Sequence, residues 1–432
     1  MCFRRSRNAI HRSASRDSEA TMFHSFEPTP TSDWIAAVEM ELGPNRAFES
    51  LVWTLEPGID VRPFYRRNDV SHHAAPLAGE HAGWLICDEY PVFDIESSEP
   101  YIEDALNGGA DTVELISRDP VSLMEHLALS RSRPGGSDLP IAIRGGNRLF
   151  RAVLETLAAG GPESSGPSAA PGDSLRGPNG PARANSIQLH LDPVRDLFER
   201  PGAELGDVES QTGGLPAPAN GAEGPAPSES VAIALGSLVD WCSAATDRGV
   251  PLGALLGRIS LVLPIGSNML VEIARLRALR LLLPQVVGAF GESLAAIPHI
   301  HATSARTPGS DRPFADQLIP ATVEALAAVL GGADSISLPA CRLADDDVSG
   351  SQGRRLMRNV QLLLREEGRL GAVSGAVAGS WYVETLTDAI AKSAWRRFLE
   401  IEDVGGLARA TAAGMIDRIG NGGETLGTPS GG

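Results

Sequence analysis

The residues with the types and spacing to hold a ligand fall in two short polar segments. They are Ser267, Asn268, His301, Thr303, Ser304 and Arg306. If each segment ends a strand of one parallel barrel, all six meet at the C-terminal mouth, where such barrels bind their ligands. Capping of the following helix would also account for Ser267 and Asn268. Arg306 is the residue expected to contact a phosphate or carboxylate, because a guanidinium offers two parallel donors.

His299 and His301 are two residues apart in an extended pattern, so their side chains should share one face of a strand. Histidines at this spacing can hold a metal ion. No acidic residue or cysteine stands near them at metal-ligand spacing, so packed, hydrogen-bonded imidazoles are the favoured interpretation. The chain also has no G-x-S-x-G, Walker A or G-x-G-x-x-G motif with a suitable acid, which leaves hydrolase, phosphate-loop and dinucleotide functions unsupported.

Composition narrows the class of protein further. The chain has 432 residues and a net charge of −17, and this acidic balance argues against nucleic-acid binding, which needs clustered Lys and Arg. The most apolar region, 259–290, is interrupted by charged residues, so we expect no membrane anchor. The 4 cysteines are scattered without a C-x-x-C pair, which predicts neither a zinc ribbon nor a disulfide framework and fits the reducing cytoplasm.

A repeated unit indicates the fold. GGADTVEL at 108–115 and GGADSISL at 331–338 each follow a helical pattern, with glycines to end the helix and a strand to continue. Further strands are predicted near 141–144, 186–191, 258–263 and 299–303. Apolar strands that alternate with helices favour an α/β fold, a (β/α)8 TIM barrel with an N-terminal extension.

The domain organisation follows from changes in composition. Two Pro/Gly-rich insertions, about 160–184 and 201–230, bury too little apolar area to fold and are expected to be disordered loops within the barrel. A split into two domains near residue 200 is the alternative. The other predicted parts are a disordered tail at 1–21, an extension or subunit-contact arm at 22–100, the barrel at 101–420 and a disordered tail at 421–432.

Several segments together resemble one family. They are VEIARLRALR, IHATSART, PATVEALAAVLGGADSI, RLMRNVQLLLREEG and AGSWYVETLTDAIAKSAWRRFLEIEDVGG, in order over about residues 255 to 415. They are similar to the substrate-binding barrel of methylmalonyl-CoA mutases. DWIAAVEMEL and DVRPFYRRNDV nearer the N-terminus resemble the start of the small, non-catalytic subunit of the bacterial two-subunit enzyme.

The resemblance implies a barrel whose axis admits the pantetheine arm of a CoA ester, with adenosylcobalamin held above its mouth by a separate domain. The sequence departs from the catalytic pattern: it has no D-x-H-x-x-G cobalt-ligand motif, and we expect no cobalamin-binding domain. The tyrosine segment before the first strand is missing, and no counterpart of the active-site histidine precedes Leu235. The T-N-x-x-x-E pair that touches the adenosyl group falls on Pro339 and Leu343, neither of which can bond a ribose.

These departures predict the small subunit of an adenosylcobalamin-dependent methylmalonyl-CoA mutase, silent by itself and paired with a large catalytic subunit. Adenosylcobalamin is then expected in the assembled enzyme and not on this chain alone, and an acyl-CoA is the ligand of any surviving pocket. The arm from Asp33 to Arg67, which contains Trp34, Trp53, Phe64 and Tyr65, has the composition of an interface anchor. The alternative is a divergent acyl-CoA mutase chain that uses a cobalamin domain on a separate polypeptide.

Overall fold

The computed structural model describes residues 29–70, 77, 82–92, 99–117, 119–124, 140–145, 147–158, 188–191, 225–292, 297–304, 314–341 and 350–416. The chain divides into two compact units, Met1–Pro63 and Phe64–Gly432. The tails predicted at 1–21 and 421–432 and the insertion at 160–184 lie outside the described residues.

The N-terminal unit consists of one helix and a small hairpin. Helix α2 spans Thr31–Leu42, a 3-10 turn η1 spans Phe48–Leu51, and strands β1 (Trp53–Glu56) and β2 (Ile59–Val61) pair antiparallel. Gly58 makes the turn between them with φ of 87°, a conformation that glycine adopts without strain.

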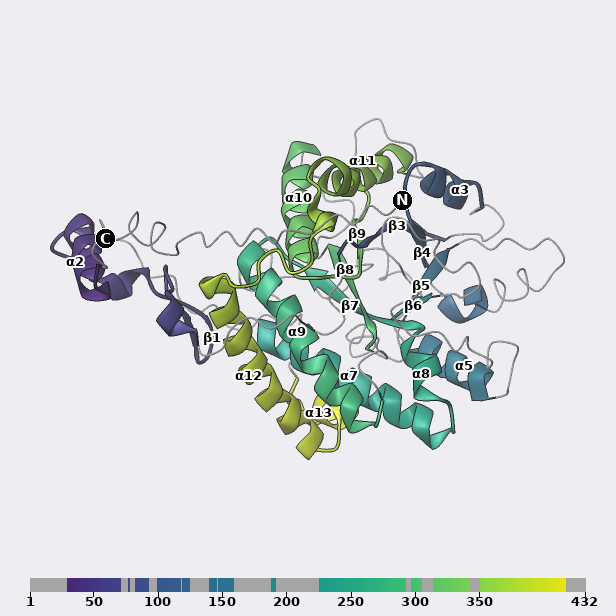
Figure 1. Cartoon of the computed structure of the whole chain (residues 1–432). Coiled ribbons are helices and arrows are strands. Elements are labelled where there is room, and N and C mark those ends of the chain that lie inside the picture. The colour runs from purple at the N-terminus through teal and green to yellow at the C-terminus, as the bar shows by residue number, and fades with distance from the viewer. Residues whose placement is uncertain are drawn as a thin grey trace, which may run out of the picture. The chain divides into compact units, whose positions relative to one another are not determined.

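The larger unit is a closed barrel of parallel strands, shown with its helices in Figure 1. The strands are β3 (Leu85–Pro91), β4 (Thr112–Ile116), β5 (Ile141–Gly145), β6 (Gln188–Leu191), β7 (Ile259–Ile265), β8 (His299–Ser304) and β9 (Ser335–Ser337). They follow one another around the ring in sequence order, and β9 pairs with β3 to close it.

The predicted class, an α/β barrel of the TIM type, is confirmed, with two corrections. Seven described strands close the ring, where eight were expected. The first strand, β3, lies before residue 101, within the segment assigned to the N-terminal extension. Strand β3 has the sequence LICDEYP, in which Asp88 and Glu89 interrupt the apolar pattern, so the sequence did not indicate a barrel strand there.

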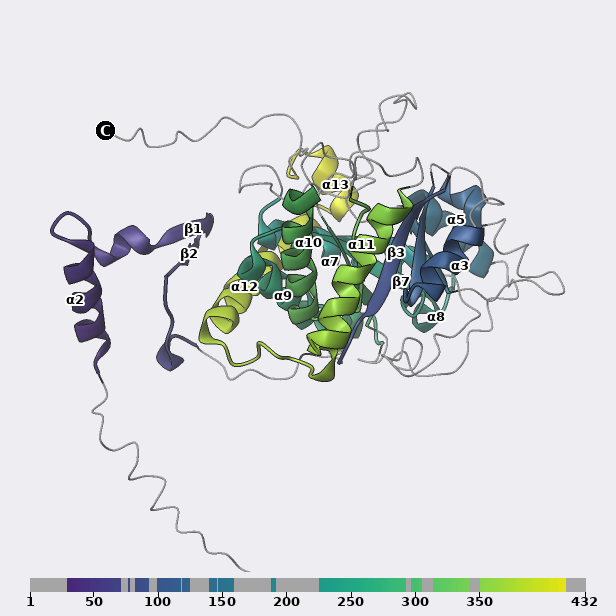
Figure 2. The ribbon, with the colours of Figure 1, turned by 90° about the horizontal axis from the view of Figure 1, so that it is seen from above.

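Helices cover the outside of the barrel. They are α3 (Glu99–Asn107), α5 (Asn147–Ala158), α7 (Pro227–Asp247), α8 (Leu252–Leu256), α9 (Met269–Ala289), α10 (Phe314–Leu330), α11 (Ser351–Leu362) with its continuation η6 (Leu363–Glu367), the turn η7 (Leu370–Ala372), α12 (Trp381–Asp403) and α13 (Leu407–Ala412); a further turn, η2, spans Arg67–Asp69. Helix α9 packs against α7, α10 and α12, and Figure 2 shows α9, α10 and α11 along one side of the barrel.

The second insertion ends earlier than predicted. Helix α7 begins at Pro227, and Ser228 and Ser230 are buried, so these residues belong to the helical wall and not to a disordered loop. Proline suits the first helical position, because its φ is preset and its missing N–H has no helical partner there. Residues 192–224 lie outside the described part. The barrel continues from β6 to β7 across this insertion, which argues against the two-domain alternative.

The arginines of α9 are buried and paired. Arg275 donates to Glu272 Oε2 at 2.9 Å. Arg277 donates to Glu384 of α12 at 2.9 Å. Arg280 donates to the Gly332 carbonyl at 2.6 Å and to Asp334 at 2.8 Å. The wall around this part of the barrel is thus joined by ion pairs as well as by apolar packing.

The two GGAD units adopt the same structure, as the repeat predicts. Gly109 and Gly332 have φ of 97° and 82°, which ends each helix in the left-handed region. The aspartate that follows then accepts a hydrogen bond from the backbone N–H of the neighbouring strand, 2.7 Å from Ile86 to Asp111 and 2.7 Å from Ile300 to Asp334. Each unit therefore stops a helix and fixes the start of two strands. Among the described residues, none of the helices is both long and apolar enough to cross a membrane.

Candidate functional site in the barrel interior

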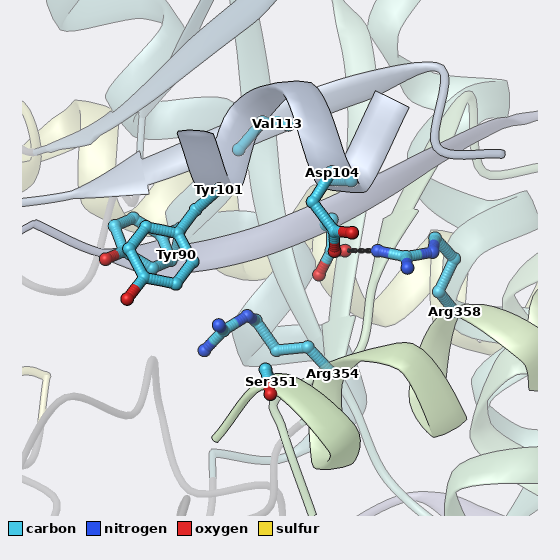
Figure 3. A pocket seen from close by; sticks show the side chains of 9 residues that line it. Tyr90, Tyr101, Asp104, Val113, Ser351, Arg354 and Arg358 are labelled. Carbon is cyan, nitrogen blue, oxygen red and sulfur yellow. Dashed lines mark hydrogen bonds and ion pairs between the residues drawn. The ribbon is translucent and has the colours of Figure 1, made fainter. Parts of the chain in front are cut away.

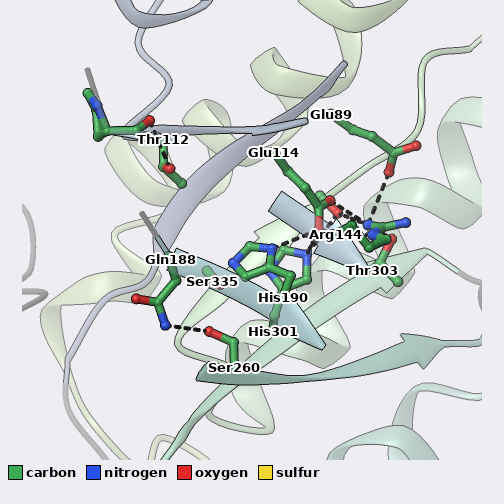
Figure 4. Close-up of polar contacts among 12 residues, drawn as sticks. Glu89, Thr112, Glu114, Arg144, Gln188, His190, Ser260, His301, Thr303 and Ser335 are labelled. Carbon is green, nitrogen blue, oxygen red and sulfur yellow. Dashed lines mark hydrogen bonds and ion pairs between the residues drawn. The ribbon is translucent and has the colours of Figure 1, made fainter. Parts of the chain in front are cut away.

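The interior of the barrel is lined by polar side chains from six strands. They are Cys87, Glu89, Glu114, Arg144, His190, His301, Thr303, Ser335 and Ser337. Each stands at an alternate position of its strand, so the pleat turns it towards the axis. Figure 4 shows most of them converging between the strands. All nine side chains are buried, so they have to satisfy one another's charges and hydrogen bonds.

Arg144 joins the two acidic residues of this cluster. Its Nε donates to Glu114 Oε1 at 2.9 Å, and its Nη2 donates to Glu114 Oε2 at 2.5 Å. Nη2 also reaches Glu89 Oε2 at 3.3 Å, Thr303 Oγ1 at 3.2 Å and Ser337 Oγ at 3.1 Å. The guanidinium therefore spans the axis from β5 to β3, β4, β8 and β9.

Beside this ion pair lie two stacked imidazoles. The ring centroids of His190 and His301 are 3.9 Å apart, with 24° between their planes. His190 Nδ1 is 2.7 Å from Glu114 Oε1. His301 Nδ1 is 2.7 Å from Ser335 Oγ, and its Nε2 is 3.1 Å from Ser337 Oγ. The potential ligand atoms of Cys87, His190 and His301 all lie within 4.8 Å of one another.

Burial and charge set the protonation of the cluster. Burial, with the neighbouring His190, lowers the pKa of His301 to about 3, so this imidazole is neutral at pH 7. Burial would raise the pKa of Glu114, but Arg144 and the two histidines hold it well below its usual value. Burial raises the pKa of Glu89 to about 7 against the opposing effect of Arg144. The firmly charged pair is therefore Arg144 with Glu114.

Only two of the six predicted site residues lie in this interior. His301 and Thr303 point to the axis, whereas Ser304 is the next residue along β8 and turns outwards to donate to Glu324 of α10 at 2.5 Å. Ser267 and Asn268 are exposed after β7. Asn268 is the N-terminal residue of α9 but makes no side-chain capping hydrogen bond. Arg306 lies outside the described residues.

No acid or cysteine stands near His301 at metal-ligand spacing in the sequence, yet the fold places Glu114 and Cys87 beside it. They come from β4 and β3, so spacing along the chain could not reveal them. A signal was present within the strands themselves. Arg144 and His190 are polar residues at alternate positions of otherwise apolar strands, a pattern that indicates side chains turned to a barrel axis.

A second polar site, drawn in Figure 3, lies on the outer side of β3. Tyr90 and Tyr101 stack with centroids 4.9 Å apart, and the guanidinium carbon of Arg354 lies 5.0 Å from the first ring and 5.8 Å from the second. Asp88 pairs with Arg358 of α11. These contacts hold α3 and α11 against the barrel. Every charged residue that lines the hollow, except Asp104, takes part in one of them.

The closed ring of parallel strands, with helices outside and polar side chains inside, defines a TIM-type α/β barrel. Residues 219–421 match the family model described as methylmalonyl-CoA mutase. The methylmalonyl-CoA mutase small subunit of Porphyromonas gingivalis is 27% identical over 93% of this chain and 67% of its own length. That of Streptomyces virginiae is 27% identical over 86% of this chain and 62% of its own length. The methylmalonyl-CoA mutase of Escherichia coli is 33% identical over 44% of this chain and 27% of its own length.

The chain is similar to methylmalonyl-CoA mutases and to their small subunits. It covers about two thirds of the small subunits named above and a smaller share of the E. coli mutase. The match to the family model begins after β6 and takes in β7, β8 and β9 with their helices. Strands β3 to β6, which supply five of the nine interior residues, lie before it.

The described residues do not fit the ligands that the family's activity requires. At the level of Glu114 the axis is filled by Arg144, His190 and His301, where a pantetheine arm would have to pass. His190 and His301 are 2% and 0% exposed, so neither can reach a corrin above the mouth. Pro339 is buried and has no hydrogen-bond donor, and Leu343 lies outside the described residues.

Proposed function

We propose that this chain is the small subunit of an adenosylcobalamin-dependent methylmalonyl-CoA mutase, and that it is catalytically silent by itself. In this proposal a large subunit binds the cofactor and the CoA ester and interconverts methylmalonyl-CoA and succinyl-CoA. The filled axis of this chain's barrel is the observation that carries the proposal. Radical rearrangement needs the substrate held away from water beside the cofactor, and a barrel packed with its own side chains has no such space.

The small-subunit role is supported by the two relatives that bear this name and match most of the chain. We further propose that the assembled enzyme works in the cytoplasm. The described cysteines, Cys87, Cys242 and Cys341, are free thiols, as is usual in a reducing compartment.

The test is co-expression with a large mutase subunit from the same source, followed by size-exclusion chromatography and an assay for succinyl-CoA. We expect a heterodimer that is active with adenosylcobalamin, and no activity from the isolated chain. Mutase activity of the isolated chain with added adenosylcobalamin would overturn the silent-subunit proposal. Activity that needs only a separate cobalamin-binding polypeptide would favour the divergent acyl-CoA mutase instead.

The N-terminal arm is the proposed contact with the large subunit. Two of its aromatic residues pack within their own units, since Trp34 contacts Phe48 and Tyr65 contacts Tyr382. Trp53 remains 41% exposed in the N-terminal unit. An exposed tryptophan in a small unit suits an interface anchor, because aromatic anchors carry much of the binding free energy of an interface.

Replacement of this residue tests the arm separately from the chemistry. Trp53→Ala should weaken heterodimer formation at least about fivefold, the equivalent of about 1 kcal/mol. Leu399→Ala on α12 is the matched control, since Leu399 is 46% exposed. Equal affinities of the two variants for the large subunit, measured by calorimetry, would remove Trp53 from the interface.

A further inference from the structure

Three potential metal ligands meet inside the barrel from strands that are distant in the sequence. Cys87 on β3, His190 on β6 and His301 on β8 present ligand atoms within 4.8 Å of one another. Their exposures are 2%, 2% and 0%. A thiolate with two imidazoles is a donor set typical of zinc, whereas magnesium and calcium bind oxygen ligands. We propose that Cys87, His190 and His301 bind a single zinc ion in the barrel interior.

Glu114 is placed to be the fourth ligand of this ion. Its Oε1 lies 2.7 Å from His190 Nδ1 and 3.6 Å from His301 Nε2. In a tetrahedral zinc site with bonds of about 2.0 to 2.3 Å, neighbouring ligand atoms are about 3.3 to 3.6 Å apart. The carboxylate is thus near the required spacing from His301 Nε2, whereas His190 would exchange its 2.7 Å contact with Glu114 for coordination. The carboxylate's charge offsets part of the ion's charge.

The neighbouring serine supplies the outer contact that such sites use. A ligating imidazole usually bonds a second polar group through its other nitrogen, which fixes the ring's orientation. His301 Nδ1 is 2.7 Å from Ser335 Oγ, so Nε2 can face the ion in exchange for its 3.1 Å contact with Ser337 Oγ. Arg144 does the same for the carboxylate, since it donates from both Nε and Nη2 to Glu114.

Binding has two structural consequences. One ion cannot lie in both ring planes while the imidazoles stack 3.9 Å apart, so one ring must turn and exchange the stack for coordination. The Cys87 thiol must also release its proton, because the thiolate is the ligand. Because metal binding releases this proton, zinc affinity should increase with pH.

The proposed zinc site does not depend on the proposed mutase role. It would add a metal ion to the polar interior of the barrel. An ion bound there would join β3, β4, β6 and β8 across the axis. The bound ion stabilises the folded chain, because the unfolded chain does not hold the four ligands together. The higher the affinity for zinc, the greater this stabilisation.

The experiment uses the full chain, first freed of metal with a chelator and shown to be folded by circular dichroism. Co²⁺ is added as a spectroscopic stand-in for Zn²⁺, and Zn²⁺ affinity is measured against a chromophoric chelator. We expect one ion per chain, the intense absorption of a tetrahedral cobalt thiolate, its displacement by Zn²⁺, and a higher melting temperature with Zn²⁺.

Variants separate the site from adventitious binding. Cys87→Ser should abolish the thiolate absorption, whereas Cys242→Ser, at another buried cysteine on α7, should retain it. Ser335→Ala leaves all four ligands in place and should weaken Zn²⁺ binding about tenfold. The proposal is overturned if folded wild-type chain gives no thiolate absorption, or if the absorption survives in Cys87→Ser.

Discussion

The two parts of the barrel wall differ in how they are built. Strands β7 to β9 are accompanied by the long helices α7, α9, α10 and α12, and buried arginines pair within that wall. Strands β3 to β6 are accompanied by the shorter described helices α3 and α5, and Glu89, Glu114 and Arg144 of these strands point into the axis. The first part matches the family model and the second lies before it.

This difference separates the resemblance of the outer wall from the chemistry of the axis, two properties that a catalytic barrel combines. The helical wall keeps the resemblance to the mutases, while Glu89, Glu114, Arg144 and His190, all from the other part, fill the axis. Side chains on the axis can change without loss of the wall, because the inner and outer faces of a strand pack against different neighbours. Resemblance in the wall is therefore a guide to ancestry and assembly more than to chemistry.

The largest expected effect is at the axis. Glu114→Gln removes the charge that faces Arg144 and His190, and should lower the free energy of unfolding by about 3–5 kcal/mol, as for other broken buried ion pairs. Urea denaturation followed by circular dichroism measures it. A loss below about 1 kcal/mol would mean that the axial network adds little to stability.

A smaller effect is expected in the helical wall. Arg280→Met should cost about 2 kcal/mol, since it removes hydrogen bonds to Asp334 and the Gly332 carbonyl. Asp334 keeps the backbone N–H of Ile300, so its carboxylate is not left without a donor. The same urea denaturation measures this loss of stability. A loss larger than that of Glu114→Gln would mean that the helical wall contributes more to stability than the axial ion pair.

The pH dependence of stability should change when Glu89 is replaced. The lowered pKa of His301, about 3, makes stability fall as pH drops below about 6.5, because the unfolded chain then binds the extra proton. The raised pKa of Glu89, about 7, has the opposite sign: the folded chain holds more protons between about 4.5 and 7, so stability falls as pH rises through that range.

These two contributions oppose each other in the wild-type chain. Glu89→Gln removes the second, so its stability should rise more steeply with pH, by about 1 kcal/mol per pH unit between pH 5 and 6.5. Unfolding free energies at pH 5.0, 6.5 and 8.0 test this. Parallel curves for the variant and the wild type would contradict the raised pKa of Glu89.

The smallest effect is expected on the surface. Lys392 and Asp388 form an ion pair on α12 at 2.6 Å, with side-chain exposures of 64% and 40%. Asp388→Asn should change the free energy of unfolding by less than about 0.5 kcal/mol, because water screens exposed pairs. It is also the control for loss of one acidic charge, and an effect near that of Glu114→Gln would show that net charge, not burial, controls the series.

The sequence predicted the parts of this fold that are local. The GGAD units, helix α10 and the start of α12 at Trp381 were all visible, because each is set by residues close together in the chain. The axial cluster was not, since Cys87, Glu114 and His301 meet only when parallel strands from distant segments align in register. Ser304 was placed with His301 because both follow one apolar run, although alternation along β8 separates them.

The pairing of β3 with β9 joins Leu85 to Ser335, the first strand of the ring to its last. Every other strand pair links neighbours in sequence, so those pairs can form early, whereas this one closes a very long loop and gains its contacts last. Until then the edges of both strands are open to pairing with another chain. A circular permutant that begins at residue 314 and continues from residue 432 to residue 64 would place β9 before β3, and should move the last-forming pair from β3–β9 to β8–β9.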